Sequence, residues 1–238
     1  MFVQVDVQQD QSADEGLIDK FEAKIKEKAF PCVGAKSALA RQRMQFLTVG
    51  DIRCPRDDKA IHDALRDFAQ AYAAAPRPFQ SFVVIFDTAG DLSEEAFELA
   101  MWQRIQSLET IDAKAGHTYD RRVSPDVEDS NFSLSFAGEA FFVVGLHPNA
   151  SRPARRFEMP ALVFNAHDQF ETLRAEGRYD TLRESIIQRD TAFAGSPNPM
   201  LARFGETSEA SQYSGRLVPQ DWKCPFQRVH GEAGDALA

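Results

Sequence analysis

Residues 81–87 read SFVVIFD and form the most strongly apolar short run in the chain. Pro76 and Pro78 precede the run and a polar stretch from Asp87 to Asp91 follows it, which is typical of a β-strand. The run lacks the alternation of polar and apolar residues that marks a half-exposed strand. We therefore expect both faces of this strand to be buried, with a layer of structure on each side.

The segments around this strand have helical character. Several of them repeat apolar residues at the spacing of three or four that is typical of an amphipathic helix, and one consists mainly of good helix formers. Helices are expected over residues 16–30, 37–46, 57–75, 93–111, 167–175 and 179–193. Two of these segments start at a serine, Ser37 and Ser93, and serine is a favoured helix N-cap.

The second half of the chain predicts more strands. In residues 131–146, a short alternating run and a longer apolar run flank Gly138 and Glu139, so this segment is expected to form a hairpin. Residues 161–165, ALVFN, predict a further strand. The chain beyond Gly195 is rich in Gly, Pro and Ser and shows no strong periodicity.

Together these elements predict an α+β fold. We expect a single domain with a mixed or antiparallel sheet of about four strands, flanking helices and a long loop-rich C-terminal segment. The domain is expected over residues 15–228, between a flexible N-terminus (1–14) and a flexible C-terminus (229–238). A chain of 238 residues is long enough to bury one sizeable core.

Composition excludes several classes of protein. The chain has 27 basic and 36 acidic residues, and its net charge of −9 argues against binding to nucleic acid or anionic membranes. No stretch approaches the roughly 18 consecutive apolar residues of a membrane span. Residues 1–15 lack the Lys and Arg of a signal peptide, and three cysteines do not make a disulfide framework. We expect a cytoplasmic protein without nucleic-acid or membrane partners.

The aromatic residues are biased towards phenylalanine, with 19 Phe against 4 Tyr. Most of the aromatic surface therefore has no polar group. A core rich in phenylalanine accounts for this bias, and the alternative is a pocket for a large, flat, apolar ligand.

His147 directly follows the apolar run 140–146, and three arginines come shortly after it: Arg152, Arg155 and Arg156. An imidazole close to a cluster of guanidinium groups suits an iron porphyrin, because the imidazole can ligate iron and the guanidinium groups can pair with the propionates. The alternative is a solvated basic turn in which the histidine caps the strand.

His167 stands at the start of a predicted helix, where the helix N-terminus lowers the pKa of an imidazole. The neutral ring would be available as a ligand or a hydrogen-bond partner, or it is an ordinary residue of the cap region. The other histidines, His62, His117 and His230, have polar surroundings and are expected at the surface.

Two of the three cysteines have neighbours that lower the pKa of a thiol. Cys32 comes just before a predicted helix, and Cys224 follows Lys223. Each is a candidate haem ligand or nucleophile, and an inert buried thiol is the alternative. The loop-rich tail adds Glu206, Glu209 and Tyr213, which could bind a polar or cationic substrate and which a solvated loop explains equally well.

Six segments together resemble the signature blocks of the YqcI/YcgG family. They occur in the expected order from Phe30 to Phe226: FPCVGAKSA, GEAFFVVGLHPNASRPARRF, LVFNAHDQFETLR, the stretch from IIQRD to FAGSPNPML, FGETSEASQYSGR and DWKCPF. Members of this family act as haem-dependent N-hydroxylases, among them the pre-guanitoxin N-hydroxylase. His147, His167, Cys32 and Cys224 occupy positions within these blocks.

The resemblance implies a haem-dependent monooxygenase with haem b as its cofactor. It would use O2 and an electron donor or reductase to N-hydroxylate a small cationic, amino-acid or guanidine-type substrate. It implies His147 or His167 as the iron ligand, with His147 preferred because the arginines follow it. Two alternatives stay open: a haem-binding sensor or carrier without turnover, and a cofactor-free enzyme that uses a cysteine nucleophile. The oligomeric state is also open, with a homodimer under consideration.

Overall fold

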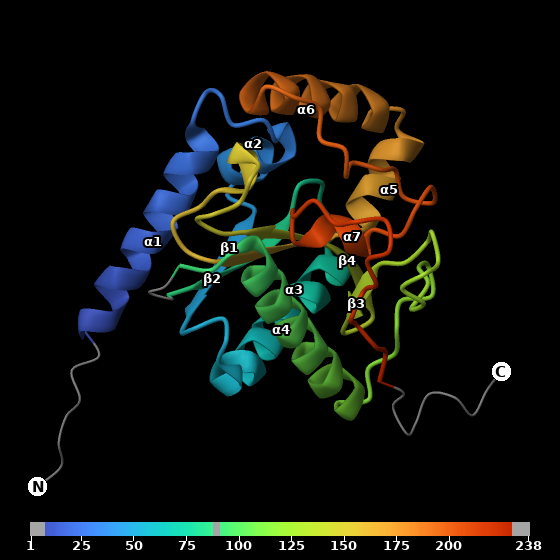
Figure 1. The fold of residues 1–238 in the computed structure, drawn as a ribbon. Coiled ribbons are helices and arrows are strands. Elements are labelled where there is room, and N and C mark those ends of the chain that lie inside the picture. The colour runs from blue at the N-terminus through green and yellow to red at the C-terminus, as the bar shows by residue number, and fades with distance from the viewer. Residues whose placement is uncertain (1–7, 88–90, 230–238) are drawn as a thin grey trace, which may run out of the picture.

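The structure is a computed structural model that describes residues 8–87 and 91–229. A five-stranded mixed sheet forms its centre, with the strand order β1-β2-β5-β4-β3 (Figure 1). The strands are β1 (Met44–Val49), β2 (Ser81–Phe86), β3 (Leu134–Phe136), β4 (Glu139–Leu146) and β5 (Ala161–Ala166). β1 and β2 are parallel, and the other neighbours are antiparallel. The prediction of an α+β fold with a single mixed sheet is confirmed.

Helices cover both faces of the sheet. α3 and α4 pack on one face, and α1 and α2 on the other, where α6 lies against α2 (Figure 1). The helices are α1 (Gln8–Lys26), α2 (Val33–Ala40), α3 (Asp58–Ala74), α4 (Glu94–Lys114), α5 (Asp168–Ala175), α6 (Tyr179–Ala194) and α7 (Ala210–Tyr213), with 3-10 turns at Pro55–Asp57 and Pro153–Arg155. The helices predicted over residues 57–75, 93–111, 167–175 and 179–193 and the cap at Ser93 are confirmed.

Strand β2 is buried on both faces, as its composition predicts. Phe82, Val84 and Phe86 point into the core under α3 and α4, whereas Val83 and Ile85 point into the core under α1. Successive side chains of a strand point to opposite faces, so one apolar run supplies both cores.

The prediction of a helix over residues 37–46 is correct only up to Ala40 and wrong for the rest. α2 begins earlier, with Cys32 and not Ser37 as its N-cap, and it ends at Ala40. Gln42 then adopts a left-handed backbone conformation with φ of 54°, which turns the chain into the extra strand β1. β1 is an edge strand with mostly half-buried side chains, so it lacks the continuous burial that makes β2 recognisable.

The chain ends were expected to be flexible over residues 1–14 and 229–238. Residues 1–7 and 230–238 lie outside the described residues, and α1 already includes residues 8–14. As expected, the segment after α6 consists mainly of loops and contains only the short helix α7 within its described part.

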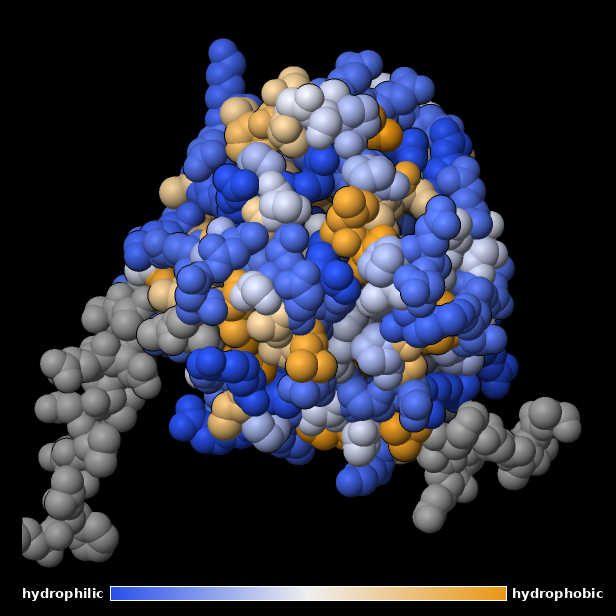
Figure 2. Space-filling view, in the orientation of Figure 1, coloured by the Kyte–Doolittle hydropathy of each residue, from blue (hydrophilic) through white to orange (hydrophobic). Residues whose placement is uncertain are grey.

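The face in Figure 2 is mainly hydrophilic, with apolar atoms in separate small areas. Among the described helices, none is long and apolar enough to cross a membrane.

Candidate functional site

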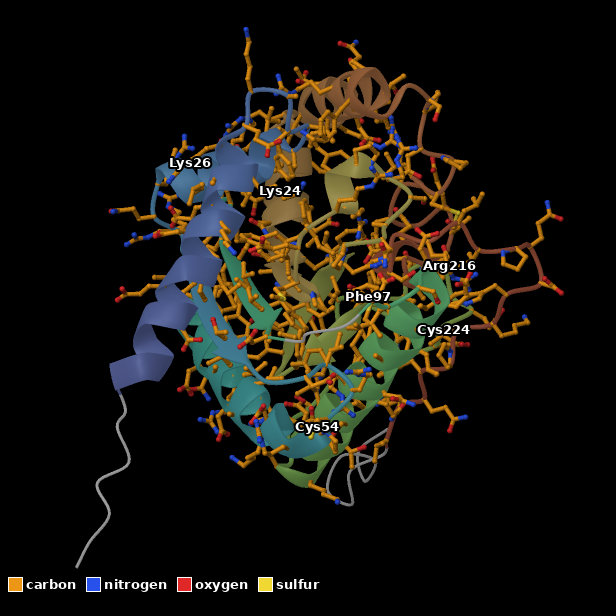
Figure 3. All side chains as sticks on the ribbon, turned by 60° about the vertical axis from the view of Figure 1, so that its left-hand side comes forward. Lys24, Lys26, Cys54, Phe97, Arg216 and Cys224 are labelled. Atoms are coloured by element: carbon orange, nitrogen blue, oxygen red, sulfur yellow. The ribbon has the colours of Figure 1, made fainter. Side chains whose placement is uncertain are left out.

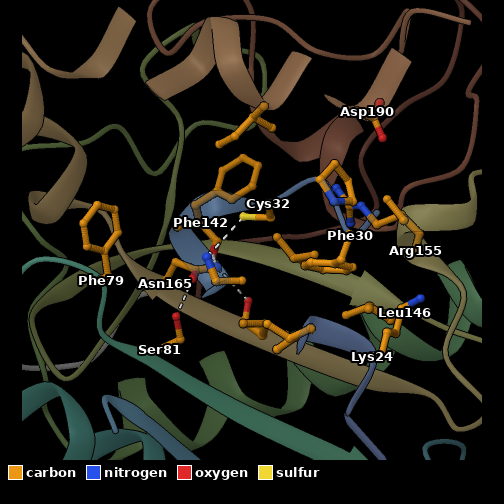
Figure 4. A pocket seen from close by; sticks show the side chains of 18 of the residues that line it. Lys24, Phe30, Cys32, Phe79, Ser81, Phe142, Leu146, Arg155, Asn165 and Asp190 are labelled. Atoms are coloured by element: carbon orange, nitrogen blue, oxygen red, sulfur yellow. Dashed lines mark hydrogen bonds between the residues drawn. The ribbon is translucent and has the colours of Figure 1, made fainter. Parts of the chain in front are cut away.

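A cavity of about 280 Å³ lies between one face of the sheet and helices α1, α2, α5 and α6 (Figure 4). Its floor is made by side chains of β4 and β5, including Val144, Leu146 and Val163. Five phenylalanines contribute to its walls: Phe21, Phe30, Phe79, Phe142 and Phe170. The cavity is thus mainly apolar and aromatic, with a few polar groups, which is the usual character of a small-molecule site.

The polar groups on the cavity floor bond with one another. Ser81 Oγ donates to Asn165 Oδ1 at 2.7 Å, and Asn165 Nδ2 donates to the carbonyl of Phe142 at 3.2 Å (Figure 4). Gln169 exchanges two hydrogen bonds with the backbone of Gln80. These bonds fix the amide side chains in position, so the floor is rigid.

Cys32 is the one predicted cysteine that lines this cavity. It caps α2, and its Sγ accepts a hydrogen bond of 3.4 Å from the backbone N–H of Ala35. Burial nevertheless raises the pKa of this thiol, which outweighs the lowering by the backbone N–H groups and by Arg155. The expectation of a lowered pKa is therefore wrong, and the cysteine is a poor free nucleophile.

Two of the three predicted arginines, Arg152 and Arg155, line the cavity. Arg152 Nη2 pairs with Asp190 Oδ2 at 2.5 Å. Arg155 donates to the backbone carbonyls of Gly145, Tyr213 and Gln212, each at 3.1 Å, and its burial lowers its pKa to about 10.

Arg156 is the exposed member of the three arginines and is not part of the cavity wall. It donates hydrogen bonds to the backbone carbonyls of Ala150 and Ser151 and so stabilises the loop after β4. The three arginines are therefore not one solvated basic patch.

His147 lies on the other face of the sheet, away from the cavity. Leu146 lines the cavity, and the next side chain along an extended strand points to the opposite face. The ring of His147 stacks on Phe97 of α4, with centroids 4.4 Å apart, and is 1% exposed. Phe97 lies in the interior of the molecule (Figure 3). Burial lowers the pKa of His147, so its ring is neutral at pH 7.

His167 belongs to a second cluster, together with Glu209 and Tyr213. His167 Nε2 lies 3.8 Å from Glu209 Oε1, and Tyr213 Oη donates to Glu209 Oε2 at 3.3 Å. Burial raises the pKa of Glu209 to about 8, and burial followed by the charge of Arg174 lowers that of His167 to about 4. At neutral pH the pair is thus a protonated carboxyl beside a neutral imidazole.

Two phenylalanines of the cavity wall separate this cluster from the cavity. Phe142 packs edge-on against Tyr213 at 5.4 Å, and Phe170 lies edge-on to His167 at 6.4 Å. Arg155 contacts both the cavity and the cluster, since it lines the cavity and donates a hydrogen bond to the backbone carbonyl of Tyr213. The cavity and the cluster are therefore neighbours that share an aromatic wall.

The remaining predicted residues lie elsewhere. Glu206 is exposed and accepts a hydrogen bond from the backbone of Arg203. Cys224 (Figure 3) packs against the core on the α3 and α4 side, and burial raises its pKa to about 12. Lys223 pairs with Glu128. The expectation that Lys223 lowers the pKa of this thiol is wrong.

Sequence reasoning missed several groups that form the cavity, above all Asn165 and Asp190. Asn165 is the one polar residue in the apolar strand ALVFNA, and that pattern is a detectable signal. The prediction that His62 lies at the surface is also wrong, because this side chain is 2% exposed. His117 is partly exposed, and His230 lies outside the described residues.

Comparison with known proteins agrees with the resemblance seen in the signature blocks. The sequence model of the YqcI/YcgG family matches residues 21–227. This range includes the whole cavity and the cluster around Glu209. The chain therefore belongs to the YqcI/YcgG family. Neither a curated protein nor a solved structure matches it significantly.

Proposed function

We propose that this protein is a haem-dependent oxygenase that N-hydroxylates a small amino-acid or guanidine-type substrate. The reaction class rests on the resemblance to the haem-dependent N-hydroxylases of the family. The observation that carries the proposal is that a thiol and two guanidinium groups, from Cys32, Arg152 and Arg155, line one phenylalanine-rich cavity.

The chemistry of the cavity residues suits a haem. Phenylalanine rings match the faces of a porphyrin, a cysteine sulfur is a known haem ligand, and guanidinium groups pair with carboxylates. The volume of about 280 Å³ is just below the usual range of small-molecule sites, so a porphyrin requires lining side chains to move outward. The segment around Leu201 forms part of the wall and belongs to the loop-rich region after α6, where such movement is least costly.

Cys32 is the ligand that we propose for the iron. When bound, haem would supply the activation of O2, and a thiolate ligand favours cleavage of the O–O bond. A metal binds the thiolate, so iron would overcome the raised pKa of the free thiol. The N–H of Ala35, already directed at Sγ, would stabilise the thiolate charge and tune the metal.

The charged groups of the cavity would orient the haem and the substrate. Arg152 carries a charge that can pair with a propionate, and Asp190, released from Arg152, can accept a cationic guanidine. Outside the cavity, behind the wall formed by Phe142 and Phe170, Glu209 would hold a proton on its carboxyl at neutral pH, next to the unpaired Nε2 of His167. In the overall reaction one oxygen atom enters an N–H bond. The other leaves as water, with two electrons from a reductase and two protons.

The test is turnover by protein reconstituted with haem. The chain is supplied with NADH, a reductase and O2, and a panel of arginine-like compounds is screened by mass spectrometry for products one oxygen atom heavier. An N-hydroxylated product that is absent without haem supports the proposal. Haem binding with no product across the panel contradicts it and favours the alternative, a haem-binding sensor or carrier. Failure to bind haem contradicts both.

A further inference from the structure

Two histidines and an aspartate meet on the opposite side of the sheet from the cavity. His62 of α3, Asp112 of α4 and His117 of the loop after α4 bring one ring nitrogen or carboxylate oxygen each into a group within 4.8 Å of one another. Asp112 Oδ1 lies 2.8 Å from His62 Nε2 and 2.7 Å from His117 Nδ1. Residues 50 positions apart in the chain thus converge on one point.

The group is held firmly in place. His62 and Asp112 are 2% and 5% exposed, and the rings of His62 and His117 stack with centroids 5.9 Å apart. The backbone N–H of Ala137 donates to both carboxylate oxygens of Asp112, which fixes the carboxylate from the side of the β3–β4 turn. Rigid donors are what a metal site requires.

The second nitrogen of His62 points to the same conclusion. Nδ1 is buried and has no hydrogen-bond partner among the described residues, and Asp63 Oδ1 is 3.8 Å away. A histidine that binds a metal through one nitrogen carries its proton on the other and usually donates it to a carboxylate. With a metal on Nε2, the N–H at Nδ1 of His62 would face the Asp63 carboxylate, which would then be its hydrogen-bond acceptor.

One side of the group is open. A pocket of about 270 Å³ is lined by Asp112 and His117, and its wall carries two more carboxyl groups, Glu109 and Asp120, and two arginines, Arg121 and Arg228. Three protein ligands with an open fourth position are the arrangement of catalytic zinc sites and of related sites for other divalent metals.

We propose that His62, Asp112 and His117 form a binding site for a divalent transition-metal ion of the Zn²⁺ type. The ligands would be His62 Nε2, His117 Nδ1 and an oxygen of Asp112, with water or a small ligand from the pocket in the fourth position. Tetrahedral ligand atoms around zinc lie about 3.3 Å apart, so the nitrogens need to move about 0.5 Å away from the carboxylate. This site is independent of the proposed haem and of the proposed reaction.

The test is a titration of the untagged full-length protein with Co²⁺, after treatment with a chelator. Co²⁺ replaces Zn²⁺ in such sites and shows visible absorption bands that depend on its geometry. We expect one Co²⁺ per chain, displaced by Zn²⁺. Binding should weaken at least about tenfold in His117→Gln and in His62→Gln. Thr118→Ala, which changes the same pocket without removing a ligand, should bind Co²⁺ as the wild type does.

Circular dichroism shows whether each variant is folded. His117 is partly exposed, so His117→Gln decides the question if His62→Gln does not fold. The proposal is overturned if the wild-type chain shows no saturable binding of Co²⁺ or Zn²⁺ up to millimolar concentration. It is also overturned if folded His117→Gln binds Co²⁺ with wild-type affinity.

Discussion

His147 and His167 lie at opposite ends of strand β4. His147 directly follows the strand, whereas the backbone N–H of His167 donates to the carbonyl of Ala140 at the start of the strand, at 2.8 Å. The extended chain from Ala140 to His147 spans about 23 Å at 3.3 Å per residue. The two imidazoles therefore cannot serve the same iron, and the residue that we propose as ligand, Cys32, lies on the cavity between α2 and the sheet.

The first prediction concerns His147. Because its ring stacks on Phe97 on the face opposite the cavity, His147→Ala should leave the absorption spectrum of bound haem unchanged. The loss of a buried ring should lower the free energy of unfolding by about 1–3 kcal/mol, measured by urea denaturation. A folded His147→Ala protein that no longer binds haem would show that His147, and not Cys32, is the ligand.

The second prediction concerns the contact between β4 and α4. A Cβ atom at Gly145 would lie 2.7 Å from Phe97 Cε1 and 3.1 Å from the carbonyl oxygen of Tyr213. Gly145→Ala should therefore lower the free energy of unfolding by about 1–3 kcal/mol. The control is Gly16→Ala in α1, where a Cβ meets no atom within 4 Å and alanine should stabilise the helix by about 0.5–1 kcal/mol. Equal stability of the two variants would contradict the close packing at Gly145.

The third prediction concerns pH. The folded-state pKa of Glu209 is raised from 4.5 to about 8, so ionisation is easier in the unfolded chain. The stability due to the protonated carboxyl is fully present below pH 4.5 and is lost as the pH rises to about 8. Between these values the wild type should lose stability relative to Glu209→Gln, which cannot ionise, and the difference should level off above about pH 8.

Thermal unfolding of both proteins across this pH range measures the effect. Other titrating groups, including His167, are present in both proteins, so their contributions largely cancel. If the difference in stability between the wild type and Glu209→Gln is constant from pH 4.5 to 8, burial does not raise the pKa of Glu209.

The fourth prediction separates two neighbouring arginines. Arg155→Ala removes the donor to three backbone carbonyls at the junction of β4 and α7, and should lower the free energy of unfolding by about 2–4 kcal/mol. Arg156→Ala removes bonds within one exposed loop and should cost less than about 1 kcal/mol. Chemical denaturation of both variants checks this order, and a larger loss in Arg156→Ala would contradict it.

Much of the fold follows from the sequence, because the strongest patterns belong to elements with uniform surroundings. β2 is apolar throughout and is buried on both faces, and Ser93 caps α4 as its residue type predicts. β1 could not be predicted in this way. Its half-buried edge position gives no clear periodicity, and the turn before it uses Gln42 in a conformation that usually signals glycine.

The site was harder to predict, since chain order does not say which side chains meet. The expectation that His147 joins Arg152 and Arg155 rests on their closeness in sequence. Because side chains alternate along β4, His147 points to one face of the sheet and Leu146 to the other. Arg152 and Arg155 line the cavity on the same face as Leu146. The grouping of His167 with Glu209 depends on the path of the loop after α6, for which the sequence has no periodic signal.

The most direct test of the proposed haem site is the absorption spectrum of the reduced, carbon monoxide-bound protein after reconstitution with haem. We predict a Soret band at the long wavelength that is typical of thiolate ligation. Cys32→Ala should lose this band, whereas Cys224→Ala should keep it, because the Cys224 thiol lies in the other core. A wild-type band at the shorter wavelength of histidine ligation, or a long-wavelength band that persists in Cys32→Ala, would contradict the account.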